Sequence, residues 1–381
     1  MLNPDRTFQV IQHIVASELA SQRGAHRADL LAATRLEDSL TDGRLAVDSI
    51  EVLSLARAVN EFFELDRSDL DEWLLRRRHL WEWRDLVQER LADGDPVFGF
   101  RSGGTTGEPK TTRLPAQHLR AEVAELAAIV GTPGRILCMA PLNHIYGFLW
   151  GALLGEELGI PLLTGEDAQG ATPTPGDLII GFPEWWRLMS GRSTSLPEGV
   201  TGVTSTAPCP SALVHQLLEQ GLGRMLEIYG SSETGGIGWR EHPGAPYRLL
   251  GHWQPQGVDR LVSQAGIEAT PPDELHWHDD RHLEPVGRRD GAVQVGGINV
   301  WPQKVEAAIA AHPGVSECAV RPFETGSGTR LKAFVVPDGH AEPEDNLKQW
   351  LKDQLPAPER PVRLDFGPEL PRNHLGKRCD W

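Results

Sequence analysis

The sequence predicts a multidomain protein of helices and strands: a helical bundle over residues 1–93, an α/β core over 96–286 and a small α+β domain over 287–381. Three observations support this prediction. Apolar residues recur at helical spacing through the first ninety residues. Short apolar runs then alternate with helical segments, as in a sheet covered by helices. After a glycine-containing junction at 287–291, the chain returns to short strands and helices.

The composition is typical of a globular chain and excludes some classes of function. The 53 acidic residues outnumber the 37 basic ones and give a formal charge of −16, which argues against a nucleic-acid-binding surface. A small polyanionic nucleotide is not excluded, because a few local donors and cations are enough to hold it. The N-terminus lacks a signal-peptide pattern, and no apolar run is long enough to span a membrane.

The cysteines indicate a reducing compartment. They are scattered without paired spacing, so they predict neither a zinc motif nor a disulfide framework. We therefore expect an untargeted, soluble, cytoplasmic protein. The four cysteines are Cys138, Cys209, Cys318 and Cys379.

Residues 1–93 are predicted to form a small helical bundle. Apolar residues from Val10 to Leu19 share one helical face, and a second helix starts after Asp48, a favourable N-cap residue. Ser49 opens that helix, where the helix dipole and unpaired amides favour a phosphodiester.

This segment resembles an acyl carrier domain, in which an Asp-Ser-Leu/Ile sequence opens the second helix and the serine carries phosphopantetheine. The resemblance implies phosphopantetheine attachment at Ser49. The alternative is that Ser49 is only a capping hydroxyl in a vestigial carrier used for docking or packing.

The stretch at 102–110, Ser-Gly-Gly-Thr-Thr-Gly-Glu-Pro-Lys, predicts a phosphate-binding loop. Its glycines permit tight turns and close approach to a ligand, while its hydroxyl groups and Lys110 supply donors and a mobile cation. It is not the P-loop of nucleotide hydrolases, because Glu108 and Pro109 separate the last glycine from Lys110. A Gly/Thr-rich turn alone is more often a surface loop, so the prediction depends on the segments that follow.

Three further motifs follow predicted strands of the core. They are Pro-Leu-Asn-His-Ile-Tyr-Gly-Phe at 141–148, Ser-Thr-Ala-Pro at 205–208 and Tyr-Gly-Ser-Ser-Glu-Thr-Gly-Gly at 229–236. Because the carboxyl ends of parallel strands meet at one edge of a sheet, we expect a site there. Each residue alone has an ordinary structural explanation, and for His144 that explanation is the commoner one. Chance does not readily explain why all of these motifs occur together in this order.

In this order the motifs resemble the ANL adenylating superfamily, which comprises acyl- and aryl-CoA synthetases, carrier-loading adenylation domains and luciferases. The resemblance implies ATP and Mg²⁺ as cofactors. It implies that the triphosphate is held by Ser102, Gly104, Thr105, Thr106, Gly107 and Lys110. It also implies contacts to the adenine and the α-phosphate from Ser205, Ala207, Pro208, Tyr229, Gly230 and Ser232.

The same resemblance implies catalytic and ribose-binding groups. His144 would lie beside the acyl pocket and the α-phosphate, and Glu233 would bind the Mg²⁺ that spreads the charge of the departing pyrophosphate. Asp279 and Asp280 occupy the place of the ribose-binding aspartate, and Asp280 is preferred. Arg288 would approach the ribose or a phosphate.

The segments before and after the predicted core also bear on the resemblance to the superfamily. Members of the superfamily have an additional subdomain before the Gly/Thr loop, where this chain has the carrier-like bundle, so the core is expected to be truncated. Residues 287–381 resemble the mobile lid of the family, with Asp290 as its hinge. Lys377 would reach into the first site and bridge carboxylate and phosphate.

Together these inferences predict an ATP-dependent acid ligase. The carboxylate of a small acid, aromatic or short-chain, would form an acyl adenylate, and a phosphopantetheine thiol would then take the acyl group. The acceptor is expected to be a carrier, either Ser49 of this chain or a separate acyl carrier protein of an assembly-line pathway. One alternative is an acyl- or aryl-CoA synthetase that uses free CoA and has a structural carrier-like domain. Another is a non-catalytic module that binds adenylates or docks onto carriers.

Overall fold

The structure is a computed structural model that describes residues 2–102, 110–192, 195–326, 328–338, 344–371 and 380–381. The chain forms two compact units, of which the first extends to Val286 and the second begins at Gly287. Among the described helices, none combines the length and the apolar character that crossing a bilayer requires.

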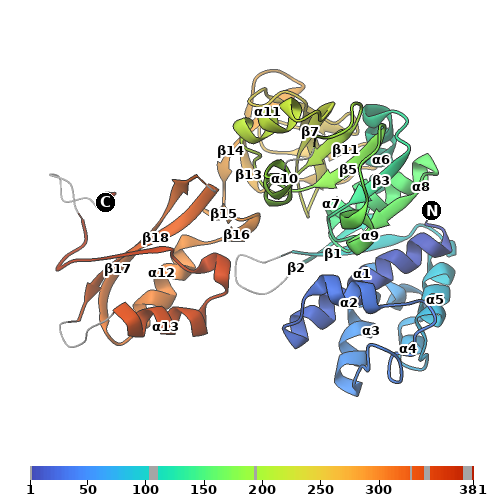
Figure 1. The fold of residues 1–381 in the computed structure, drawn as a ribbon, viewed down its shortest axis with the longest axis horizontal. Helices are drawn as coiled ribbons and strands as arrows, with labels where there is room; N and C mark the ends of the chain where they lie inside the picture. The colour runs from blue at the N-terminus through green and yellow to red at the C-terminus, as the bar shows by residue number, and fades with distance from the viewer. Residues whose placement is uncertain (1, 103–109, 193–194, 327, 339–343, 372–379) are drawn as a thin grey trace. The chain divides into compact units, whose positions relative to one another are not determined.

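Helices form the N-terminal part of the first unit (Figure 1, blue). The first helix begins after Asn3, whose side chain accepts a hydrogen bond of 2.9 Å from the Arg6 N–H. The third helix begins with a capping box, in which Asp48 and Glu51 each accept a hydrogen bond from the other's backbone N–H. These elements are α1 (Pro4–Arg23), α2 (Arg27–Ala33), α3 (Ser49–Phe63), η1 (Leu65–Ser68), α4 (Asp71–Leu74) and α5 (Leu80–Ala92).

A nine-stranded mixed sheet lies at the centre of the described part of the first unit, in the order β13-β14-β9-β8-β7-β6-β5-β3-β4. The strands from β4 to β7 run parallel, which confirms the predicted α/β core, whereas β8 and β9 run antiparallel to their neighbours. The strands are β3 (Arg135–Cys138), β4 (Leu162–Thr164), β5 (Asp177–Gly181), β6 (Thr201–Thr204), β7 (Arg224–Ser231), β8 (Gly235–Arg240), β9 (Tyr247–Leu249), β13 (Asp273–Trp277) and β14 (His282–Arg288). A smaller antiparallel sheet contains β10 (Trp253–Pro255), β11 (Leu261–Ser263) and β12 (Glu268–Ala269).

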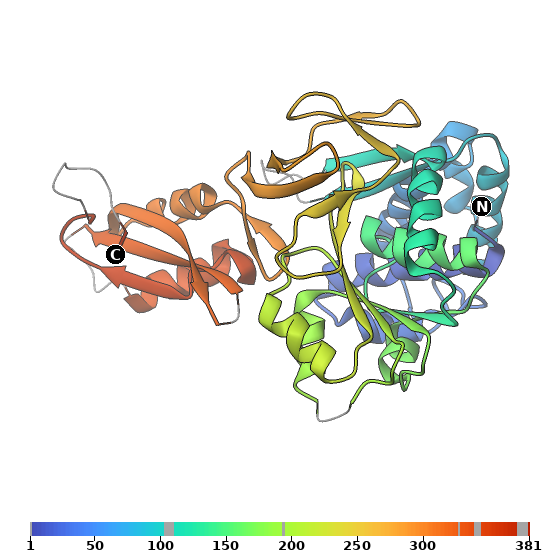
Figure 2. The same cartoon turned by 90° about the horizontal axis from the view of Figure 1, so that it is seen from above.

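Alternate residues of the central strands pack into different hydrophobic clusters. Ile136 and Cys138 of β3 belong to the cluster that contains α6, while Leu137 belongs to the cluster that contains α10 and α11. Both faces of the sheet are therefore covered, and Figure 2 shows the teal helix α6 and the yellow-green helix α11 on opposite sides of it. The covering helices are α6 (Ala116–Val130), α7 (Ile145–Gly147), η2 (Phe148–Leu153), α8 (Leu154–Leu158), α9 (Gly165–Gly170), α10 (Pro183–Ser190) and α11 (Ser211–Glu219).

The N-terminal helices share a core with the rest of the first unit. Two antiparallel strands, β1 (Val97–Ser102) and β2 (Lys110–Pro115), follow the helices. Phe62 of α3 packs against Phe98 of β1 and Phe148 of η2, with ring centroids 6.1 and 5.2 Å apart. The compact unit therefore extends across the boundary predicted near residue 93, because the apolar faces of the helices are completed by the hairpin and the sheet region.

The second unit is the small α+β domain that the sequence predicts. Its strands β17 and β18 are antiparallel and β19 runs parallel to β18. Val305 and Leu347 pack two helices onto Val335 of this sheet. The elements are β15 (Val293–Val295), β16 (Ile298–Val300), α12 (Pro302–Ala310), β17 (Val315–Thr325), β18 (Gly328–Pro337), α13 (Glu344–Gln354), η3 (Ala357–Glu359) and β19 (Arg363–Phe366).

Candidate active site

The carboxyl ends of β6 and β7 bring two of the predicted motifs together. These strands are parallel neighbours, with Thr204 paired with Glu227. Immediately after β6, the Ser205 hydroxyl donates a hydrogen bond of 2.9 Å to the Ile228 carbonyl of β7. Ser205 therefore lies beside the strand that carries Tyr229, as expected for a site at the edge of parallel strands.

The segment after β6 is tied to β7 at both ends. Thr206 has a φ of 76°, a left-handed conformation that is rare for a β-branched residue. Beyond Ala207 and Pro208, the Cys209 N–H donates a hydrogen bond of 3.1 Å to the Glu227 carboxylate. The predicted adenine-binding segment is thus a fixed loop at the sheet edge.

Tyr229 contacts a carboxylate that the sequence reasoning did not select. Its hydroxyl donates a hydrogen bond of 2.8 Å to Asp273 Oδ2, and its ring packs against Tyr247 with centroids 5.6 Å apart. Asp273 is the first residue of β13. Polar and apolar residues alternate from Glu274 to Trp277, which marks a strand, and Asp273 directly precedes this pattern.

Asp279 and Asp280 lie in the turn between β13 and β14. The Asp279 carboxylate accepts hydrogen bonds of 2.8 Å from the N–H groups of Arg281 and His282 and lies 2.9 Å from the His282 ring nitrogen. These hydrogen bonds hold the pKa of Asp279 below its usual value. Asp279 therefore caps this turn. Asp273, which contacts Tyr229, is a second candidate beside Asp280 for binding the ribose.

The turn between β7 and β8 carries Ser232 and Glu233. Thr234 Oγ1 accepts a hydrogen bond of 3.2 Å from the Ser231 N–H, and Ser231 Oγ accepts one of 3.2 Å from the Glu233 N–H. A Cβ at Gly230 would overlap the carbonyl that faces it on β8, so this approach requires glycine. Glu233 is exposed on a hydrogen-bonded turn, and its carboxylate is the kind of ligand that Mg²⁺ prefers.

A cavity of about 230 Å³ opens beside His144. Ile14 and Phe62 contribute apolar groups to its lining, and Arg101 and Asn143 contribute polar ones. The lining combines α1, α3, β1 and the loop before α7. His144 is the N-cap of α7, and its Nδ1 accepts a hydrogen bond of 3.4 Å from the Tyr146 N–H.

His13 supports this loop and was not identified from the sequence. It is buried in α1, and its Nδ1 accepts a hydrogen bond of 3.1 Å from the Leu142 N–H. Burial, reinforced by the nearby Arg27 guanidinium, lowers the pKa of His13 from 6.5 to about 3. A neutral imidazole therefore holds the loop that leads to His144. Helical spacing alone marks His13 only as a residue of α1.

Arg288 and Asp290 pair with each other at the start of the second unit. The Arg288 guanidinium donates hydrogen bonds of 2.8 and 3.1 Å to the two Asp290 carboxylate oxygens. Burial acts to raise the pKa of Asp290, but Arg288 and the Ala292 N–H outweigh it, and the pKa lies below its usual value. The predicted hinge residue is thus ionised and paired four residues after the boundary at Val286.

Several predicted residues lie outside the part of the chain that the structure describes. Lys110 is described as the exposed first residue of β2. The residues outside the described ranges are Gly104, Thr105, Thr106, Gly107 and Lys377, together with the side chain of Ser102.

Comparison with known families gives matches along most of the chain. The profile of the AMP-binding enzyme family matches residues 16–302, and that of the AMP-binding enzyme C-terminal domain matches residues 304–377. The first match begins within α1 and so includes the end of that helix and the helices α2 to α5.

Two curated relatives match over nearly the full length. A 4-coumarate–CoA ligase of Halorhodospira halophila is 36% identical over 388 residues, covering 99% of each chain. A 4-coumarate–CoA ligase of Rhodobacter capsulatus is 36% identical over 376 residues, covering 95% of this chain and 96% of the relative.

Solved structures share the fold at lower identity. The amide bond synthetase McbA from Marinactinospora thermotolerans matches with a TM-score of 0.61 and 18% identity, covering 99% of this chain and 98% of McbA. The o-succinylbenzoate CoA synthetase MenE of Bacillus subtilis matches with a TM-score of 0.59 and 18% identity, covering 74% of this chain and 67% of MenE.

Proposed function

This chain belongs to the AMP-binding enzyme family of adenylate-forming acid–thiol ligases, and we propose that it converts a small aromatic acid into its CoA thioester through an acyl adenylate. The observation that carries the proposal is the contact between Tyr229 and Asp273, beside Ser205 at the edge of the sheet. At this edge, the aromatic ring can stack on the base of a nucleoside, and the carboxylate can accept hydrogen bonds from its ribose.

The nucleotide is proposed to bind along this edge. The adenine would stack on Tyr229 beside the loop after β6, and the Asp273 carboxylate would accept hydrogen bonds from the ribose hydroxyls. Ser232 would bind the α-phosphate, since it lies on the turn that follows β7. The Gly/Thr loop leads into Lys110 and would hold the β- and γ-phosphates.

Glu233 fits the Mg²⁺ that accompanies ATP in this chemistry. Its carboxylate is exposed on the turn beside Ser232, and carboxylate oxygen is a preferred ligand for this hard cation. When bound, the ion would spread the negative charge of the departing pyrophosphate.

The cavity beside His144 is the proposed site for the acid. Phe62 and Ile14 line the cavity with apolar groups suited to a flat ring, and Asn143 and Arg101 line it with polar groups. The carboxylates of Glu18 and Glu61 also line it and pair with Arg101. An aromatic acid is further supported by the relatives named 4-coumarate–CoA ligases.

The proposed reaction has two steps. First, a carboxylate oxygen attacks the α-phosphorus of ATP, and the bond to pyrophosphate breaks. His144 would orient the carboxylate between the cavity and the phosphates, and Lys377 would neutralise the charge that develops. Second, the CoA thiol loses its proton to solvent and attacks the acyl carbonyl, which releases AMP.

Free CoA is the acceptor that the relatives favour, in contrast to the carrier preferred from the sequence. Attachment of phosphopantetheine to Ser49 stays a second candidate, because Ser49 is the exposed first residue of α3 and two apolar residues of the same turn, Ile50 and Leu53, are also exposed.

An acid panel tests the proposed function. The protein is incubated with ATP, Mg²⁺ and either 4-coumarate, cinnamate, benzoate or a long-chain fatty acid, and pyrophosphate release is measured with and without CoA. We expect the hydroxycinnamate to give the highest rate and CoA to yield its thioester. Absence of pyrophosphate release with every acid would instead support a non-catalytic binding module.

Mass spectrometry separates the two acceptors. The protein is incubated with CoA and a phosphopantetheinyl transferase, with Ser49→Ala as the matched control. With free CoA as acceptor, the mass stays unchanged and Ser49→Ala retains thioester formation. A phosphopantetheine adduct that is absent from Ser49→Ala would establish the carrier route.

A further inference from the structure

A buried group of two histidines and a glutamate lies outside the residues assigned above. His118 and Glu122 are one turn apart on α6, and His252 directly precedes β10. All three side chains are buried, with exposed fractions of 0%, 0% and 1%. Each offers one potential ligand atom, and these atoms lie within 4.8 Å of one another.

Hydrogen bonds on the outer side of the cluster fix the histidine tautomers. His118 Nε2 lies 3.0 Å from the Thr234 carbonyl, and His252 Nδ1 lies 3.0 Å from a Glu125 carboxylate oxygen. Because both partners accept hydrogen bonds, each of these nitrogens carries the proton. The lone pairs are therefore on His118 Nδ1 and His252 Nε2.

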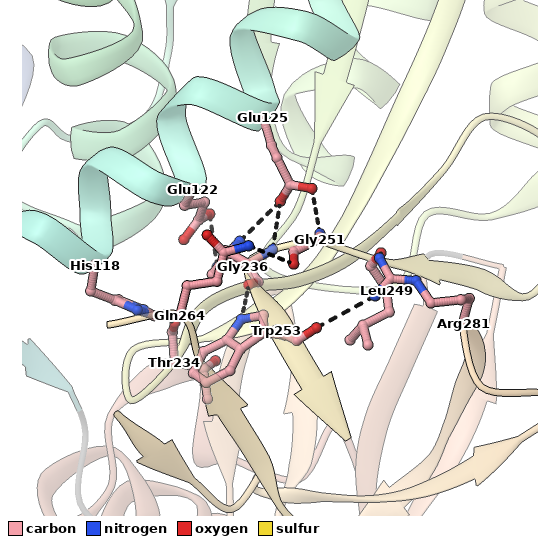
Figure 3. A network of polar contacts seen from close by, with 11 residues as sticks. His118, Glu122, Glu125, Thr234, Gly236, Leu249, Gly251, Trp253, Gln264 and Arg281 are labelled. Carbon is pink, nitrogen blue, oxygen red and sulfur yellow. Dashed lines mark hydrogen bonds and ion pairs between the residues drawn. The ribbon is translucent and has the colours of Figure 1, made fainter. Parts of the chain in front are cut away.

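The glutamate is oriented in the same way. One Glu122 oxygen accepts a hydrogen bond of 2.9 Å from the Gly236 N–H. The backbone lies so close to this carboxylate that a Cβ at Gly235 or Gly236 would overlap it. Figure 3 shows His118, Glu122 and Glu125 projecting from the same helix, with Glu122 above Gly236 and Glu125 above Gly251.

Three buried polar atoms of this cluster are left without a partner in the described part of the chain. Within the described residues, His118 Nδ1, Glu122 Oε2 and His252 Nε2 have no hydrogen-bond partner. Burying three acceptors without a donor is costly, so a cation or another proton source is needed to balance them.

We propose that His118, Glu122 and His252 bind a zinc ion. Two imidazole nitrogens and one carboxylate oxygen form a common zinc ligand set, with a fourth position open for water. When bound, a divalent ion would displace any proton from the Glu122 carboxyl, and Glu122 and Glu125 would then balance its two positive charges. Ligand bonds of about 2.0–2.2 Å require ligand atoms roughly 3.3 Å from one another, so the cluster, whose potential ligand atoms lie within 4.8 Å, would contract when the ion binds.

The surrounding contacts have the arrangement of an outer shell for a metal. Metal-binding histidines usually donate their other N–H to a carboxylate or a carbonyl, and His252 and His118 do so to Glu125 and Thr234. The ion would cross-link α6 to the segment before β10, and the hydrogen bonds of His118 to Thr234 and of Glu122 to Gly236 would extend this link to the start of β8. It would hold the turn that carries Glu233 without touching the substrates.

Metal analysis of the purified protein tests this site. After passage over a chelating resin to remove loosely bound ions, we expect about one zinc per chain. Stripping with a strong chelator should lower the melting temperature, and Zn²⁺ alone should restore it. Co²⁺ in its place should give the visible absorption of a four-coordinate nitrogen and oxygen site.

Variants identify the ligands. Glu122→Gln keeps the acceptor for the Gly236 N–H but removes the anionic ligand, and His252→Gln removes a nitrogen ligand; both should lose the zinc. Glu125→Gln changes only the outer contact and should weaken zinc binding by about 10–100-fold. His13→Gln, which replaces another buried histidine of the same unit, should retain the metal.

Two outcomes would overturn the proposal. One is a protein, purified from zinc-supplied medium, that holds only substoichiometric zinc and shows no change of melting temperature with Zn²⁺; the cluster would then be balanced by a shared proton or a water molecule. The other is full zinc retention in both Glu122→Gln and His252→Gln, which would place the metal elsewhere in the chain.

Discussion

At the scale of single residues, neighbouring carboxylates acquire different roles from their contacts. Asp273 lies against the phenol of Tyr229, whereas Asp279 is engaged by the turn between β13 and β14. The sequence shows a conspicuous acidic pair at 279–280, while Asp273 stands apart from it. Proximity to Tyr229 depends on pairing across the sheet, which spacing along the chain does not reveal.

Asparagine substitutions distinguish the two candidates for ribose binding. Asp273→Asn keeps an acceptor for Tyr229 but loses the charged acceptor for ribose hydroxyls, so kcat/KM for ATP should fall by about 10–100-fold, the equivalent of one charge-assisted hydrogen bond. Asp280→Asn should change kcat/KM for ATP by no more than about twofold. Steady-state kinetics at varied ATP check this, and a larger loss in Asp280→Asn would return the role to the acidic pair.

His13 predicts a specific pH dependence of stability. Its pKa is about 3 in the folded chain, against 6.5 ordinarily. Below pH 6.5 the unfolded chain therefore binds a proton that the folded chain does not, and stability is lost as the pH falls toward 3. From pH 7.5 to 5 this single group should reduce the free energy of unfolding by about 2 kcal/mol.

Urea unfolding of the parent protein and His13→Gln at these two pH values measures the contribution. The histidines other than His13 are common to both proteins, so the difference between the two pH effects belongs to His13. Equal pH effects in the two proteins would show that His13 does not remain neutral in the folded state.

At the scale of elements, the close contact between α3 and β1 allows a direct test of how the N-terminal helices pack on the rest of the first unit. A Cβ at Gly99 of β1 would overlap the Glu61 backbone carbonyl of α3. Gly99→Ala should therefore destabilise the first unit by about 1–3 kcal/mol. Gly134→Ala is a matched control, since a Cβ there meets no neighbouring atom.

Thermal or urea unfolding of both glycine variants measures this difference. If Gly99→Ala unfolds like its control, α3 and β1 are not in the close contact described.

The elements themselves were largely predictable. The helix from Asp48, the strands before the 141–148 and 229–236 motifs, and the small terminal domain all follow from periodicity and caps. The sequence did not reveal His13, because its role depends on the Leu142 N–H, which lies 129 positions away. The cluster of His118, Glu122 and His252 was missed for the same reason: its members come from distant segments.

At the scale of the whole molecule, the N-terminal helices belong to the first compact unit. The AMP-binding enzyme profile begins at residue 16, and a relative aligns over 99% of each chain. The compact arrangement predicted as a truncated core is thus shared with that relative. A carrier domain would be expected to fold by itself, whereas these helices complete their core with β1 and η2.

A fragment of residues 1–93 should therefore fail to fold cooperatively when expressed alone. It would leave Phe62 without Phe98 and Phe148, and a short chain gains little from burial alone. Circular dichroism during heating provides the measurement, with residues 1–286 as the control. A sharp melting transition of the 1–93 fragment would support an independent carrier-like domain.

The central claim is that the reaction passes through an acyl adenylate. The most direct test traces a carboxylate oxygen of the acid into the products. 4-Coumarate labelled with ¹⁸O in its carboxylate is converted in the presence of ATP and CoA, and the AMP is analysed by mass spectrometry. An acyl adenylate requires one labelled oxygen to appear in the phosphate of AMP, because the carboxylate oxygen stays on phosphorus when the thiol attacks the carbonyl. AMP that carries no label while thioester forms would contradict adenylate formation.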